Sequence, residues 1–131
     1  MTQDARTDLT QRIDTIESGY EFLLAYAAQG RQDDAGSNAR ETLQAMQAAL
    51  EGLGEVAVAA LGTAGEDAAA FLDAVKSDAR IARGAINLVL SRPSISSLLI
   101  DNLNASVHLR ALLTDLFLIE QTLKTGGQSP K

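Results

Sequence analysis

The stretch SLLIDNLNASVHLRALLTDLFLIEQTL, residues 97–123, decides the fold of this chain of 131 residues. Its apolar residues recur at alternating spacings of three and four, which places them along one side of an α-helix. A helix with such a stripe needs other helices to cover it. Extended back to Ile95, the stripe consists of Ile95, Leu98, Asn102, Ala105, Leu109, Leu112, Leu116, Ile119 and Leu123.

Three earlier segments show the same alternation, so we expect an all-α, up-down-up-down antiparallel four-helix bundle over residues 1–125. The predicted helices span about residues 4–29, 38–61, 64–91 and 94–124, and residues 126–131 are expected to form a flexible tail. The stripes comprise Leu9, Ile13, Ile16, Tyr20, Leu23 and Ala27; Leu43, Met46, Leu50, Leu53, Ala57 and Ala60; and Leu72, Val75, Ala79, Ala82, Ile86 and Val89.

Helix-start and helix-stop residues separate the four segments. Asn38 with Glu41, and Thr63 with Glu66, have the spacing of a capping box. In a capping box, the side chain of each residue accepts a hydrogen bond from the backbone N–H of the other. Pro93 ends the third helix, and Pro93 or Ser94 begins the fourth. Gly52 and Gly54 either break the second helix or admit a close neighbour, and the continuous stripe across them favours one kinked helix.

Composition excludes several classes of function. The net charge of −6 and the lack of a large basic cluster disfavour nucleic-acid and anionic-membrane partners. The chain has no cysteine, which removes disulfides, thiolate metal sites and a cysteine nucleophile. The polar residues 1–10 do not read as a signal peptide, and no apolar run is long enough to span a membrane, so we expect a cytoplasmic protein.

His108, the one histidine, offers little for catalysis or metal binding. A di-iron or di-manganese bundle needs paired Glu-x-x-His motifs, which one histidine cannot supply, and no serine lies in a nucleophile motif. We therefore predict no catalytic residue, no metal site and no cofactor. A histidine on a four-helix bundle resembles the phosphotransfer domains, but Leu109 and Arg110 follow it where such domains have a lysine and then a small residue. Phosphotransfer is a weaker alternative.

A small-ligand or metal site inside the bundle is the second hypothesis for function. It would use Glu17, Tyr20, Glu21 and His108, provided that the first and fourth helices are neighbours. Charged lines on the first helix (Asp14, Glu17, Glu21) and the third helix (Lys76, Arg80, Arg83) have the same length, and they could pair with each other or remain solvated.

The fourth helix carries more apolar side chains than one bundle stripe requires. Leu99, Leu103, Leu113 and Phe117 lie along a second flank, which we expect to be an interface, with a purely internal position as the alternative. Asn102 would then be a buried register residue, whose replacement by leucine should raise stability. The leading hypothesis is a noncatalytic interaction protein, an adaptor, accessory subunit or regulator, that forms a homodimer through this helix or binds a different protein.

Overall fold

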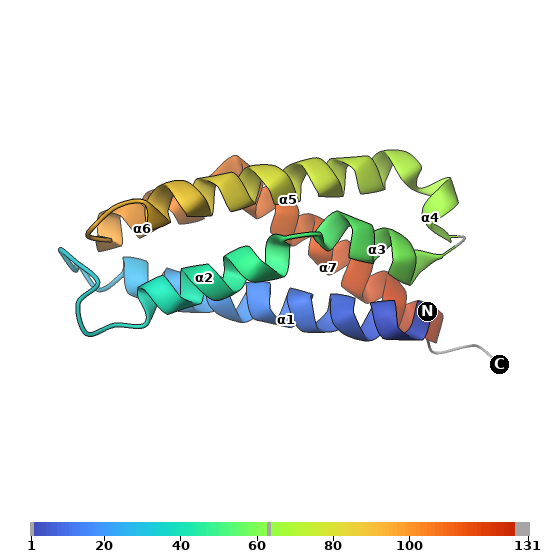
Figure 1. Cartoon of the computed structure of the whole chain (residues 1–131), viewed down its shortest axis with the longest axis horizontal. Helices are drawn as coiled ribbons and strands as arrows, with labels where there is room; N and C mark the ends of the chain where they lie inside the picture. Colours follow the sequence, from blue (N-terminus) through green and yellow to red (C-terminus); the bar gives the residue numbers. More distant parts are fainter. Residues whose placement is uncertain (1, 63, 128–131) are drawn as a thin grey trace.

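The computed structural model describes residues 2–62 and 64–127, and these residues form only helices, turns and loops (Figure 1). The predicted all-α class is confirmed. No helix in the described ranges is both long and apolar enough to cross a membrane. The helices are α1 (Thr2–Ala27), α2 (Ala39–Leu50), α3 (Leu53–Leu61), α4 (Ala64–Asp67), α5 (Ala69–Leu90), α6 (Ser97–Asn104) and α7 (Val107–Gly127).

The first predicted helix is α1, which runs the length of the molecule alongside α2 and α3 (Figure 1). It packs against α2, α3 and α6, and more lightly against α7. The predicted stripe is buried as far as Leu23, but Tyr20 is only half-buried, and Tyr26 rather than Ala27 is fully buried beyond it. Gly19 is needed for the contact with α2, because a Cβ there would lie 2.5 Å from Cγ of Met46.

The second predicted helix is two helices, so the prediction of one kinked helix is wrong. α2 ends at Leu50, and α3 begins at Leu53 after Gly52, whose φ of +73° is one that glycine adopts without strain. The alternative prediction, that a glycine here allows another helix to pack closely, is confirmed at Gly54. A Cβ on Gly54 would lie 2.2 Å from Cγ of Lys76 and 3.2 Å from its Cα, so α3 and α5 could not pack this closely with any other residue.

The start of α2 lacks the predicted capping box. Asn38 occupies the N-cap position but makes no side-chain capping bond, and the N–H of Ala39 instead donates to the Ser37 hydroxyl at 3.2 Å. The prediction for Asn38 with Glu41 is therefore wrong. Thr63, on which the second predicted box depends, lies outside the described residues.

The third predicted helix is divided into the short α4 and the long α5, which begins at Ala69 and ends before Pro93. α5 packs against α2, α3 and α7. All six residues of its predicted stripe are buried, which confirms this part of the core: Leu72, Val75, Ala79, Ala82, Ile86 and Val89.

The fourth predicted helix is also two helices. α6 begins later than predicted, after Ser96, whose hydroxyl accepts the N–H of Leu99 at 3.0 Å. α6 ends at Asn104, and α7 begins at Val107 and continues to Gly127, past the predicted start of the tail. The break changes the buried face of the first part. The predicted core residues Leu98, Asn102 and Ala105 are exposed, whereas Ser97, Ile100, Leu103 and Asn104 are buried. After the break, Leu109, Leu112, Leu116 and Ile119 are buried as predicted.

Asn104 takes the buried polar position that was predicted for Asn102. Its side-chain Nδ2 donates to the carbonyl oxygen of Leu23 at 3.1 Å. Its Oδ1 is buried and has no hydrogen-bond partner among the described residues. Such an unpaired acceptor costs stability, since it has lost its bonds to water.

A polar cluster joins the end of α1 to the segment that precedes α6. The buried Tyr26 hydroxyl lies 2.6 Å from the carbonyl oxygen of Ile95 and 3.1 Å from that of Asp33, and can donate to either. The Ser97 hydroxyl donates to the Tyr26 carbonyl at 2.7 Å. The N–H of Ile95 donates to the Asp34 carboxylate at 2.9 Å, and this bond is the main reason that the pKa of Asp34 is lowered. The cluster fixes the loop after α1 against the start of α6.

Candidate functional site

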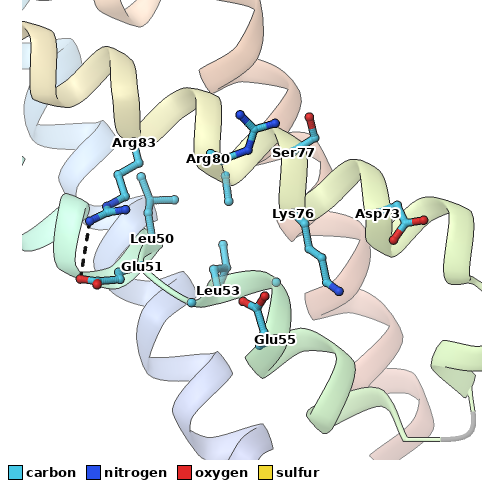
Figure 2. A pocket seen from close by; sticks show the side chains of 12 residues that line it. Leu50, Glu51, Leu53, Glu55, Asp73, Lys76, Ser77, Arg80 and Arg83 are labelled. Carbon is cyan, nitrogen blue, oxygen red and sulfur yellow. Dashed lines mark ion pairs between the residues drawn. The ribbon is translucent and has the colours of Figure 1, made fainter.

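A pocket of about 510 Å³ opens where the chain breaks between α2 and α3, facing α5 (Figure 2). Gly52 lies at the break, and Gly54 allows α3 to pack closely against α5. These two glycines therefore shape the pocket. Leu50, Leu53 and Ala79 supply its apolar lining. Its polar and charged lining consists of Glu51, Glu55, Asp73, Lys76, Ser77, Arg80 and Arg83.

The charged groups of the pocket come in equal numbers of each sign and do not converge on one point. Arg83 reaches across to Glu51, with 3.8 Å between their charged atoms. Figure 2 shows Lys76 extending toward α3, whereas Arg80 points away from α3. The lining contains no histidine, and Ser77 therefore has no neighbouring imidazole as a base.

A cluster of carboxyl groups lies between α1 and α7. Oxygen atoms of Asp14, Glu17 and Glu120 lie within 4.8 Å of one another. The pKa of Glu17 is raised to about 7, mainly by burial and also by the charge of Glu120, a side-chain hydrogen bond with Glu120 and the charge of Asp14, whereas Lys124 lowers it. Carboxylates this close are potential ligands for a hard divalent cation, and they can equally share a proton.

A second carboxyl pair lies between α5 and α7. Burial raises the pKa of Asp115 to about 7, helped by a side-chain hydrogen bond with Asp78 and by the charge of Asp78. One carboxyl oxygen in each pair, on Glu17 and on Asp115, is buried without a conventional hydrogen-bond donor among the described residues. A proton shared within each pair satisfies these oxygens.

The four predicted ligand-binding residues do not form the cluster that was expected. Glu17 lies with Asp14 and Glu120 on the interface of α1 with α7. Tyr20 is half-buried against the core, and Glu21 is exposed on α1. His108 is exposed at the second position of α7. The expectation that the first and fourth predicted helices are neighbours is confirmed by the contacts of α1 with α6 and α7.

The charged lines of the first and third predicted helices have other partners. Arg83 pairs with Glu51 rather than with the acidic line of α1. Glu17 and Asp14 meet Glu120 of α7, a residue that sequence reasoning did not select. Its position directly after the core residue Ile119 is the signal that could have placed it at a helix interface.

The predicted interface residues divide between the core and the surface. Leu103 and Leu113 are only 5% and 4% exposed and belong to the chain's own core, and Leu99 is partly buried against it. Phe117 is 51% exposed. The apolar surface of α7 is therefore different from the predicted flank, and it includes Val107 and Leu118, which are 70% and 57% exposed.

Leu118 also borders a second, strongly apolar pocket of about 380 Å³ between α7 and the end of the molecule that holds α4. Phe71 of α5 and Leu61 of α3 line its other walls. The pocket is continuous with the apolar surface of α7 through Leu118. Its remaining lining residues are Ala68, Ile119 and Thr122.

No family model, no curated protein and no solved structure significantly matches this chain. The arguments about function therefore depend on the geometry alone.

Proposed function

We propose that the chain is a noncatalytic helical interaction protein, an adaptor, accessory subunit or regulator, that forms a homodimer through the outer face of α7. In this proposal α2 with α3, and α6 with α7, act as two long but broken helices of an up-down four-helix bundle. The observation that carries the proposal is the exposure of three large apolar side chains on one helix: Val107, Phe117 and Leu118.

The spacing of these residues favours a contact with another helix. Val107, Thr114 and Leu118 are separated by seven and four positions, so these three exposed residues follow one line along α7. Phe117 lies beside this line. Burying a side chain of this size contributes about 1.5–3 kcal/mol, and a single chain forgoes that stabilisation at each exposed position.

A second copy of the chain is the partner that this surface fits best. Closed two-fold dimers are the commonest assembly of soluble proteins, and in them one patch meets its own copy. An apolar helical face satisfies this requirement, because the same side chains are complementary to themselves when two helices pack together. The pocket beside Leu118 adds a recess that a side chain of the second copy could enter.

Light scattering across a dilution series tests the proposal. We expect a dimer for the wild type and a folded monomer for the double variant Phe117→Glu/Leu118→Glu. Leu88→Glu is the matched control, because Leu88 is 70% exposed but lies on α5, and this variant should remain dimeric. A wild type that is monomeric at every concentration, or a dimer that survives the double substitution, would refute the proposal.

A further inference from the structure

On two sides, α7 meets its neighbours at pairs of acidic residues. On one side an oxygen of Glu17 on α1 lies within 4.8 Å of an oxygen of Glu120. On the other side Asp115, which has a buried carboxyl oxygen, forms a side-chain hydrogen bond with Asp78 of α5. The ion pairs found in the described part of the chain involve α1, α2, α5 and the nearby loops, and none involves α7. The contacts of α7 with its neighbours therefore include two places where like charges would meet if every carboxyl group were ionised.

The surroundings of the two pairs provide little compensation for such charges. The groups that act on Glu17 are Asp14 on its own helix and Glu120 and Lys124 on α7, so one cation faces three carboxyl groups. The group that acts on Asp115 is Asp78, without a cation. The buried oxygen atoms of Glu17 and Asp115 accept no conventional hydrogen bond within the described ranges. One proton in each pair removes the repulsion and supplies the missing donor.

We propose that α7 is a pH-sensitive element, which carboxyl–carboxyl hydrogen bonds between Glu17 and Glu120 and between Asp78 and Asp115 hold against α1 and α5, and which loosens when both pairs lose their proton. The proposal concerns the contacts of α7 with α1 and α5, and it does not rest on the proposed dimer. No bond other than these hydrogen bonds changes: each pair releases one proton to solvent.

The direction of the effect follows from the raised pKa values. The pKa of Glu17 and that of Asp115 are each raised to about 7 in the folded state, whereas the ordinary values of 4.5 and 3.8 apply to the unfolded chain. Between these limits the folded state binds more protons, so its stability falls as the pH rises and levels off above about pH 7. Both residues are partly solvated, so we expect each pair to change the unfolding equilibrium constant by roughly tenfold between pH 5 and pH 8.

Denaturant unfolding of the full chain at pH 5 and pH 8, followed by circular dichroism, tests the proposal. The wild type should be less stable at pH 8. The double variant Glu17→Gln/Asp115→Asn keeps a hydrogen-bond donor in each pair without the charge, so it should lose most of this difference. The matched control Glu21→Gln/Asp101→Asn removes two exposed carboxylates and should keep the wild-type difference.

Two further measurements on the wild type keep the test independent of how the variants fold. Carbon NMR of the side-chain carboxyl groups should give titration midpoints near pH 7 for both pairs, and exchange of the α7 amides should show lower protection at pH 8. The proposal is overturned if wild-type stability is constant or rises from pH 5 to pH 8, or if the carboxyl groups titrate near the ordinary pKa values of Glu and Asp. It is also overturned if elemental analysis finds a stoichiometric divalent cation, since an ion would then replace the shared proton of Glu17.

Discussion

Removal of the Tyr26 hydroxyl tests which contacts fix the end of α1 against the segment before α6. Tyr26 is fully buried, and its hydroxyl lies 2.6 Å from the carbonyl oxygen of Ile95, in a segment far along the chain. The change Tyr26→Phe removes this donor and keeps the ring, which stacks near Phe22 and lies beneath the guanidinium of Arg31. The substitution therefore isolates the hydrogen bond from the packing.

The expected loss comes from the acceptor that is left behind. A buried carbonyl group that loses its donor and cannot reach water costs about 1–3 kcal/mol. The Asp33 carbonyl, at 3.1 Å, adds little to this loss, because one hydroxyl proton cannot serve two acceptors fully at once. For a domain of this size, 1 kcal/mol corresponds to a change of about 4 °C in the midpoint of thermal unfolding, so the midpoint should fall by roughly 4–12 °C.

Tyr20→Phe is the matched control for this prediction. Tyr20 is half-buried on the same helix, and no hydrogen bond of its hydroxyl is found among the described residues. Its replacement should change the unfolding free energy by less than about 0.5 kcal/mol. Calorimetry or denaturant unfolding of both variants decides the matter. If Tyr26→Phe is no more destabilising than Tyr20→Phe, the hydroxyl does not join α1 to the segment before α6.

Two pairs of substitutions test the close packing and the buried polar group. Gly54→Ala should destabilise the fold by about 1–2 kcal/mol in denaturant unfolding, because its Cβ would meet the backbone of Lys76, whereas Gly84→Ala, with open space around it, should stabilise α5 by up to about 1 kcal/mol. Asn104→Leu should raise the thermal midpoint, because it removes a buried acceptor without a partner, and the Leu23 carbonyl that loses the Asn104 donor still has its helical bond within α1. Asn102→Leu on the exposed side of α6 should leave the midpoint nearly unchanged. Equal effects of the two asparagine variants would contradict the conclusion that Asn104, and not Asn102, is the buried polar residue of α6.

The helical class and much of the core could be predicted because the apolar spacing is a local property. α5 is the best case: its whole predicted stripe is buried, from Leu72 to Val89. The apolar pattern is a weaker guide where two neighbouring lines of residues on a helix fit nearly the same spacing. In α1, burial passes from Tyr20 and Ala27 to Gly19 and Tyr26, one position away, since 3.6 residues per turn allow a stripe to drift.

Two of the three helix breaks, between α2 and α3 and between α6 and α7, were harder to predict, for different reasons. At Gly52 the sequence carried the signal, but the continuous stripe from Leu50 to Ala57 outweighed it, and the structure keeps that stripe buried on both sides of the break. At Ala105 and Ser106 neither glycine nor proline marks the break. There the burial of Ser97 and Asn104 by contacts with Tyr26 and Leu23 determines the phase of α6, and such contacts are invisible in a single helix pattern.

The carboxyl pairs could not be predicted because they depend on which helices are neighbours. Glu17 was selected from the sequence, but its partner Glu120 and the pair of Asp78 with Asp115 are residues from separate helices, each unremarkable on its own. The charged lines suggested pairing of the first and third predicted helices, whereas α1 packs against α2, α3 and α6, and α5 packs against α2, α3 and α7. Charge patterns within one helix therefore predict its exposed side better than its partner.

Different side chains of α7 would carry the dimer contact and the response to pH. The outer line of α7, formed by Val107, Thr114 and Leu118, contains no ionisable group, whereas the inner contacts contain the two carboxyl pairs. If α7 is the dimer surface and is also loosened by ionisation, dimerisation weakens as the pH rises, although the line itself does not titrate. The charge-neutral variant Glu17→Gln/Asp115→Asn separates the two causes, because it removes the dependence on pH and leaves the outer line intact. A dimer whose dissociation constant is independent of pH, in a chain whose stability does depend on pH, would mean that the loosening of α7 does not reach its outer face.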